Sequence, residues 1–163
     1  MRVLVTSASR YGSTTAIADA IGRSLSARGL LVDVSPVSEA GDVSGYDAVV
    51  LGSGIYLGRW LPPALEFAEG QRDALASRPT WLFSAGLAGR QPKADASRAV
   101  MLAELIEAIG PRDHVLFGGL FDRAVMDDEE RAQLAAVPTP DGDYRDWAEI
   151  EAWANAIADE LVV

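Results

Sequence analysis

Uninterrupted apolar runs of strand length are the feature that most constrains how this chain can fold. The run Ala48-Val49-Val50-Leu51 is an example. A strand that is apolar at every position is buried on both faces, which is typical of a parallel sheet covered by helices. Similar runs recur along the chain, and they predict strands near Arg2–Thr6, Leu31–Ser35, Asp47–Ser53, Thr80–Ser84 and His114–Phe121.

Segments with helical periodicity separate these runs. In the first of them, Ile17, Ile21 and Leu25 recur at the spacing of one helix face. The segment Pro36–Gly45 is too broken for a long helix, and we expect it to cross over with little regular structure. The predicted helices are Thr14–Arg28, a helix from near Leu61 towards Leu75, Lys93–Ile109, and a last helix that begins after Asp146.

This alternation predicts an α/β fold, a doubly wound three-layer sandwich with a five-stranded parallel sheet of order 2-1-3-4-5. A length of 163 residues suits a single domain over residues 1–163. Ligands of such sheets bind beyond the carboxyl ends of the strands, where the strand order reverses. Three loops are therefore expected to form the site, namely Ser7–Thr14, Ser53–Trp60 and Ser84–Arg90.

The loop after the first strand is rich in hydroxyl groups, and its sequence is Ser9-Arg10-Tyr11-Gly12-Ser13-Thr14. It aims backbone N–H groups, hydroxyls and the positive end of a helix at one place, and a phosphate is the usual occupant of such a place. The alternative interpretation is a serine-rich loop that only caps the first helix.

Composition narrows the class of protein. The formal net charge of −10 argues against binding nucleic acid or anionic lipid, and it suits either a basic protein partner or plain solubility. There is no cysteine, so no disulfide or thiol nucleophile is expected. No run is long enough for an integral membrane segment, and the chain passes directly into a strand without a signal peptide. We therefore expect a cytoplasmic protein.

The first loop resembles the FMN-phosphate loop of the flavodoxin-like family, written Ser-x-x-Gly-x-Thr, at Ser9, Gly12 and Thr14. The resemblance implies that the hydroxyls of Ser9 and Thr14 and the N–H groups of residues 10 to 15 bind the phosphate. The form Ser-x-Tyr-Gly-Ser-Thr is closer to the branch that contains the menaquinone-dependent protoporphyrinogen dehydrogenases. The Asp146-Trp147 pair before the last helix is also similar to that branch.

The loop after the third strand, Gly52–Trp60, resembles the flavin loop of the same branch. Tyr56 is then expected to stack on the isoalloxazine ring, unless it merely packs with Trp60 at the start of the next helix. The third loop has no aromatic residue, which implies a ring face that is open or covered only by Leu87. The expected cofactor-binding residues are Ser9, Arg10, Tyr11, Gly12, Ser13 and Thr14, then Ser53, Gly54, Ile55, Tyr56, Leu57 and Gly58, and finally Ser84, Ala85, Gly86 and Leu87.

Other sites are not expected. We find no convincing catalytic acid or base and no metal cluster, and the acidic run Asp127–Glu130 is interpreted as a solvated face. This run lies in Asp122–Val137, where the protoporphyrinogen dehydrogenases carry a basic and apolar insert. The glycines of Gly52–Gly58 do not form an NAD fingerprint, because they follow the third strand and lack the acidic residue further on.

The sequence thus predicts an FMN-binding redox protein. The leading hypothesis is a small oxidoreductase similar to protoporphyrinogen dehydrogenase, which passes electrons through FMN to a quinone or porphyrinogen-like substrate or to a redox partner protein. One alternative is an electron-transfer flavodoxin without a substrate of its own. Another is a non-redox interaction module that has lost its flavin.

Overall fold

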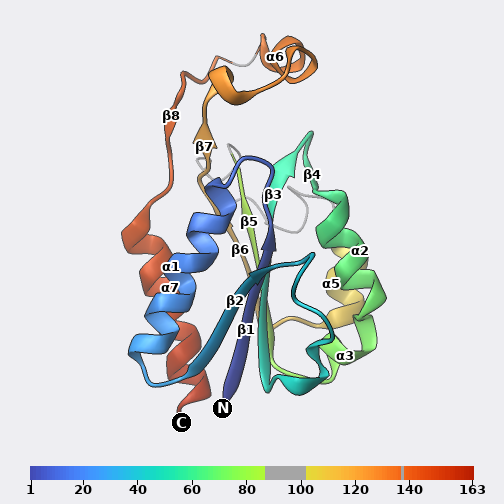
Figure 1. Cartoon of the computed structure of the whole chain (residues 1–163), viewed down its shortest axis with the longest axis vertical. Coiled ribbons are helices and arrows are strands. Elements are labelled where there is room, and N and C mark those ends of the chain that lie inside the picture. The colour runs from blue at the N-terminus through green and yellow to red at the C-terminus, as the bar shows by residue number, and fades with distance from the viewer. Residues whose placement is uncertain (87–101, 137) are drawn as a thin grey trace.

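The structure of the chain is a computed structural model that describes residues 1–86, 102–136 and 138–163. Its main sheet has the order β2-β1-β3-β5-β6, and neighbours on this path run parallel. These are the five predicted strands, so the predicted order 2-1-3-4-5 is confirmed (Figure 1). Their bounds are Arg2–Ala8 for β1, Leu31–Pro36 for β2, Ala48–Tyr56 for β3, Thr80–Ala85 for β5 and Asp113–Phe117 for β6.

Helices cover both faces of this sheet, which gives the three layers of the predicted α/β sandwich (Figure 1). One face carries α1 and α7, and the other carries α2, α3 and α5. Their bounds are Ser13–Ala27 for α1, Pro62–Gly70 for α2, Arg72–Ala76 for α3, Ala103–Ile109 for α5 and Trp147–Leu161 for α7. The earlier part of the helix predicted over Lys93–Ile109 lies outside the described residues.

Successive residues of the inner strands point to opposite faces of the sheet. In β1, Val3 and Val5 belong to the core beneath α1 and α7, whereas Leu4 belongs to the core beneath α2 and α5. Val50 and Val49 of β3 divide in the same way. Both faces meet a helix layer, and this is why the strands are apolar at every position rather than at every second one.

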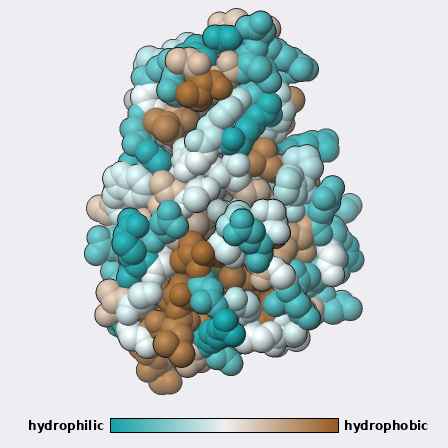
Figure 2. Space-filling view, in the orientation of Figure 1, coloured by the Kyte–Doolittle hydropathy of each residue, from teal (hydrophilic) through white to brown (hydrophobic). Residues whose placement is uncertain are grey.

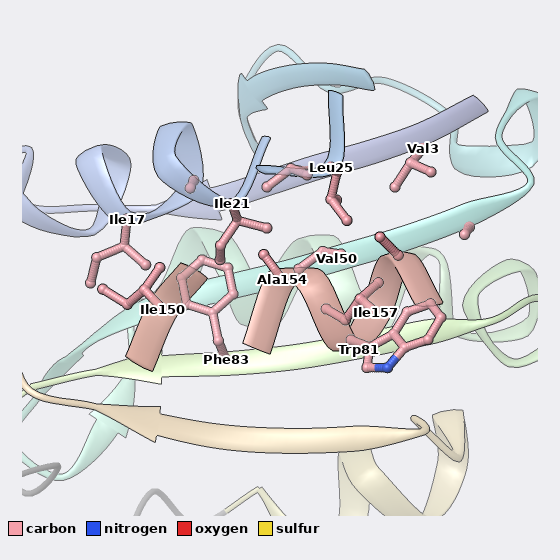
Figure 3. Packing of buried hydrophobic residues seen from close by; sticks show 14 of the residues in the cluster. Val3, Ile17, Ile21, Leu25, Val50, Trp81, Phe83, Ile150, Ala154 and Ile157 are labelled. Carbon is pink, nitrogen blue, oxygen red and sulfur yellow. The ribbon is translucent and has the colours of Figure 1, made fainter. Parts of the chain in front are cut away.

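The core beneath α1 and α7 holds the two helices together over the sheet (Figure 3). Ile17 and Ile21 of α1 and Ile150 of α7 are all fully buried there. Burial of each such side chain contributes about 1.5–3 kcal/mol by removing apolar surface from water. The stripe that the sequence predicts on the first helix is thus the surface that fixes α1 behind the first loop.

The helix expected from Leu61 towards Leu75 is interrupted, because α2 ends at Gly70 and α3 begins at Arg72. Gln71 lies at the break with φ of −123° and ψ of 23°, outside the helical region. Its side-chain amide accepts a hydrogen bond from the Val43 N–H at 2.7 Å and donates one to the Gly41 carbonyl at 3.0 Å. These bonds anchor the crossover segment, whose regular structure is limited to the 3-10 turn η1 (Val43–Gly45), as expected.

The predicted strand His114–Phe121 is two strands, because the sheet strand β6 ends at Phe117 and the chain then leaves the sheet. A short strand β7 (Leu120–Phe121) pairs antiparallel with β8 (Gly142–Asp143). Between them lie the 3-10 turn η3 (Arg123–Val125) and helix α6 (Asp128–Leu134). We call residues 118–146 the insert, and in Figure 1 it rises beyond the carboxyl end of the sheet.

The surface carries few large apolar side chains. In Figure 2 hydrophobic residues gather over the lower part of the edge strand β2, where Leu31 and Val34 are exposed. A smaller group lies on the insert, where Leu120 and Val125 are exposed (Figure 2). Within the described part of the chain, no helix combines the length and the apolar character that crossing a membrane requires.

Candidate cofactor-binding site

A cavity of about 300 Å³ lies beyond the carboxyl ends of β1, β3 and β5, where the sequence places the site. All three expected loops reach it, and the insert forms a further wall. The expected residues that line it are Arg10, Tyr11, Ser13 and Thr14 of the first loop, Gly54, Ile55, Tyr56, Leu57 and Gly58 of the second, and Ala85 and Gly86 of the third. Leu87, the expected cover of one ring face, lies outside the described residues.

The first loop presents the amino end of α1. Gly12 is the N-cap residue, its φ is +91°, and because it has no side chain it makes no cap hydrogen bond of its own. The left-handed backbone at this position favours glycine, because other residues pay a steric penalty there. The positive end of the helix dipole therefore stays available for a phosphate, whereas the Thr14 N–H already bonds the Ser9 hydroxyl.

Ser9 shapes this loop from inside. Its hydroxyl oxygen accepts hydrogen bonds from the Gly12 N–H at 3.0 Å and from the Thr14 N–H at 3.3 Å. Neither Ser9 nor Gly12 lines the cavity, so the two residues set the path of the loop rather than its inner surface.

Thr14 and Gly54 bring the first two loops into contact at the bottom of the cavity. Thr14 is buried, and its hydroxyl lies 3.1 Å from where a side-chain Cβ at position 54 would stand. A larger residue at position 54 would therefore press on the Thr14 hydroxyl. A hydroxyl, the amino end of a helix and an apolar slot above them match the phosphate and the ring of FMN, so the residues present fit this cofactor.

The second loop is a tight hairpin. The short strand β4 (Arg59–Trp60) pairs antiparallel with the end of β3, with Tyr56 opposite Arg59. The two turn residues, Leu57 and Gly58, have φ values of 53° and 73°. Positive φ at both turn positions is the signature of the type I′ turn, which normally takes Asn-Gly or Asp-Gly. The expected structure here was a loop. The hairpin was not predicted, because leucine is not a typical residue of this turn.

Two serines expected in the site have other partners. The Ser53 hydroxyl donates to the Gly54 carbonyl at 2.7 Å and accepts from the Leu61 N–H at 3.0 Å. The Ser84 hydroxyl accepts from the Trp60 indole N–H at 2.7 Å and also bonds the His114 Nε2 at 2.8 Å. Neither serine lines the cavity. Their hydroxyls instead fix the base of the hairpin that carries Tyr56.

The insert supplies lining residues that the sequence analysis missed, and they are Gly119, Leu120, Phe121, Met126, Glu130, Gln133 and Leu134. Phe121 is an aromatic residue on this wall. It lies outside the three loops that the family resemblance highlights. A signal was present in the sequence, because Asp127 followed three residues later by Glu130 is a typical helix start. The Asp127 carboxylate does accept a hydrogen bond from the Glu130 N–H at 2.8 Å.

The interpretation of Asp127–Glu130 as a solvated face is wrong for its last residue. Asp127, Asp128 and Glu129 are exposed, but Glu130 is only 3% exposed. Its carboxylate forms an ion pair with Arg10 at 2.5 Å and accepts a hydrogen bond from the Tyr11 hydroxyl. This hydrogen bond is the main reason why the pKa of Tyr11 is raised above its ordinary value. Burial of a charge requires such partners.

Within the described residues, no three His, Cys, Asp or Glu side chains form a group that could hold a metal ion. The cavity is lined by hydroxyls of the first loop, by the charged pair Arg10 and Glu130, and by apolar side chains. The individual residues named above as FMN contacts stay predictions.

A family model described as a flavodoxin domain matches residues 4–147. Solved structures resemble the chain over almost its whole length. Flavodoxin 2 from Bacillus cereus has a TM-score of 0.66 at 21% identity, with 98% of this chain and 99% of that chain covered. A flavodoxin from the domain Archaea has a TM-score of 0.64 at 18% identity, with 99% of each chain covered.

A larger protein shares the same architecture in part. Rubredoxin oxygen:oxidoreductase from Desulfovibrio gigas has a TM-score of 0.62 at 16% identity, and the match covers 98% of this chain but 36% of that chain. At such identities these neighbours show the fold alone. Among curated protein sequences, none matches the chain.

Proposed function

Because this chain belongs to the flavodoxin-domain family and its cofactor is FMN, we propose that it is a small FMN-dependent oxidoreductase. The observation that carries this proposal is the cavity at the carboxyl end of the sheet, which the insert extends beyond the three cofactor loops. A cavity shared between cofactor loops and a separate apolar wall suits a small-molecule reactant beside the ring.

The residues have distinct roles in this proposal. The amino end of α1 and the Thr14 hydroxyl bind the phosphate, and Tyr56 and the backbone of the hairpin hold the ring. Ala85 and Gly86 line the cavity at the start of the third loop. FMN supplies the electron transfer when bound, and the protein contributes binding, orientation and the electrostatic environment.

We further propose that this chain is related to the protoporphyrinogen dehydrogenases but differs from them in how it meets its electron acceptor. The Tyr-Gly-Ser-Thr loop and the Asp146-Trp147 pair support the relation. On the insert, however, Asp127, Asp128 and Glu129 are exposed, and a surface of this sign is repelled by anionic lipid headgroups. The acceptor is therefore expected to be a quinone or porphyrinogen-like molecule that reaches the site from water, in a cytoplasmic protein without cysteine.

The test is anaerobic reoxidation of the chemically reduced FMN protein, followed by its visible absorbance. Mixed with a water-soluble benzoquinone, the protein is expected to react at a rate that saturates with quinone concentration, because the quinone first binds in the cavity. Free reduced FMN is the control, and its rate rises linearly. A linear dependence for the protein as well would contradict the oxidoreductase proposal.

The acidic exposed face of the insert favours a second candidate, an electron carrier that docks on a basic redox partner. Charge complementarity steers such encounters and makes them sensitive to salt. In the same experiment with a basic cytochrome as acceptor, a carrier reacts rapidly and slows steeply with ionic strength. FMN as the cofactor argues against the third alternative, a module without flavin.

A further inference from the structure

Glu130 is the only buried residue of helix α6, all of whose residues the structure describes. Most other residues of this short helix are exposed, yet Glu130 is only 3% exposed. A buried carboxylate is stable only with partners that compensate for its lost hydration. The position of these partners therefore shows what α6 is fixed to.

Both partners come from the phosphate loop, far away in the sequence. One oxygen of Glu130 pairs with the Arg10 guanidinium at 2.5 Å and accepts the hydrogen bond of the Tyr11 hydroxyl. Asp127 adds a second contact, because one of its oxygens lies 3.3 Å from the Arg10 guanidinium while the other caps α6. The insert is thus attached by charge and hydrogen bonds to the loop that receives the phosphate.

Arg10 extends this connection to the second loop. Its guanidinium carbon lies 4.4 Å from the centre of the Tyr56 ring, a favourable cation–π arrangement. Arg10, Tyr11, Tyr56 and Glu130 all line the cavity. Phosphate loop, hairpin and insert therefore meet at one guanidinium, and the carboxylate of Glu130 fixes where that guanidinium lies.

From this geometry we propose that Glu130 is a positioning residue for the cofactor. It holds Arg10 against Tyr56 and Tyr11 against the insert, so that three separate segments close around FMN and slow its release. The proposal extends the proposed function and rests on FMN binding, whichever acceptor the protein uses. A charge on the insert, and not only the cofactor loops, then determines how long FMN stays bound.

The test compares E130Q with E129Q. Both replace a glutamate of α6 by glutamine, but Glu129 is exposed and has no place in the cavity. FMN dissociation is followed by the recovery of flavin fluorescence after the FMN-loaded protein is diluted far below its dissociation constant. E130Q is expected to release FMN at least tenfold faster than the wild type, whereas E129Q stays within twofold. Riboflavin, which lacks the phosphate, is expected to show the same factor, because the closure acts on the whole cavity.

A double-mutant cycle separates positioning through Arg10 from a general loss of structure. If Glu130 acts mainly through Arg10, E130Q adds no more than about a threefold change in an R10Q background, which is the share of the remaining Tyr11 hydrogen bond. Full additivity would overturn the proposal, as would an unchanged rate. Slower release of FMN by E130Q would also overturn it, because Arg10 would then be a cation that Glu130 keeps away from the phosphate.

Two further results keep the test decisive. Should E130Q fail to fold, Y11F removes the hydrogen bond from the other side and is expected to speed FMN release about threefold, less than E130Q because the ion pair of Glu130 with Arg10 remains. An unchanged rate in Y11F then counts against the proposal. Failure of the oxidoreductase proposal would leave all these dissociation rates unaffected, so the two outcomes are distinguishable.

Discussion

Leu57 combines a backbone conformation that leucine rarely adopts with an exposed side chain. Its φ is 53°, and its side chain is 60% exposed at the tip of the hairpin. The left-handed region costs an ordinary residue about 1–2 kcal/mol, whereas asparagine tolerates it. We expect L57N to raise the free energy of unfolding by about 1 kcal/mol in urea titrations of the apoprotein. A gain of this size would mean that the wild-type protein is less stable because it has a leucine, and not an asparagine, at this position beside the cavity.

The control is L31N, which makes the same change at an exposed leucine of β2. Leu31 is not among the residues with positive φ, so no strain is relieved there. L31N is expected to leave stability unchanged or to lower it, because asparagine is disfavoured in strands. Equal gains in both variants would show that surface polarity, and not the turn, is responsible.

Thr14 is the residue on which the predicted phosphate contact depends most directly. T14V keeps the shape of the buried side chain and removes its hydroxyl. We expect FMN to bind at least about tenfold more weakly, equivalent to about 1.4 kcal/mol or more, as for the loss of one hydrogen bond to a charged group. Fluorescence titration measures this, and riboflavin is the control ligand because it has no phosphate. A matching loss of riboflavin affinity would place the effect of Thr14 outside the phosphate contact.

For single residues, the sequence predicted which side chains lie near the cavity better than it predicted their hydrogen-bond partners. Eleven of the expected residues line the cavity, yet Ser53 and Ser84 turn inward to bond Leu61 and Trp60. A motif locates a hydroxyl near a site, but the direction of its hydrogen bond depends on residues that are distant in the sequence. Glu130 was missed for the same reason, since its partners lie 119 or more positions away.

Among the elements, those with long apolar periodicity were predicted well. The five sheet strands and α1 and α7 are confirmed within a few residues, because burial on a helix or strand face leaves a repeated pattern. The short elements β4, β7, β8 and α6 were missed. A two-residue strand has no periodicity, and α6 buries a single residue, so neither leaves a periodic pattern; only the helix start at Asp127 and Glu130 pointed to α6.

The junction of β8 and α7 is held by a charge pair that makes a definite prediction about pH. Both Asp143 oxygens accept hydrogen bonds from the Arg145 guanidinium at 2.8 Å, and another nitrogen of Arg145 donates to the Ser13 carbonyl at 3.2 Å. The hydrogen bonds from Arg145 are the main reason why the pKa of Asp143 lies below its ordinary value. This pair connects the end of the insert to the start of α1.

We expect D143N to lower the free energy of unfolding by about 1 kcal/mol at neutral pH, as for a well-aligned ion pair. A carboxyl whose folded pKa is depressed stabilises the fold above its unfolded pKa of about 3.9, and this contribution is lost as the pH falls through the folded value. The difference between wild type and D143N is therefore expected to shrink below about pH 4. Urea unfolding from pH 7 to pH 3 measures it.

The control is D128N, which changes a fully exposed aspartate of α6 that pairs with Arg131 three residues on. A pair of this kind contributes little, so D128N is expected to stay within about 0.5 kcal/mol of the wild type at every pH. A D143N difference that persists unchanged at pH 3 would show that Asp143 acts through packing and not through its charge.

In the whole molecule, the insert and the sheet domain meet at the cavity, so binding there has consequences for both. Ligand at 100 times its dissociation constant stabilises the folded state by about 2.7 kcal/mol. We expect FMN to slow amide hydrogen exchange in residues 118–136 as well as in the first loop and the hairpin. Exchange measured with and without FMN tests this, and slowing confined to the two loops would contradict it.

The path of the insert has one more consequence. It leaves the sheet at Gly118 and returns at Tyr144, and these two residues touch, because a side chain on Gly118 would collide with the Tyr144 carbonyl. The Tyr144 N–H also bonds the Gly119 carbonyl at 2.9 Å. The first and last residues of this segment are therefore in contact with each other. A segment of another length or charge can therefore replace residues 119–143 while the path of every sheet strand stays the same. The wall of the cavity that this segment forms is the part of the protein that such a replacement would change.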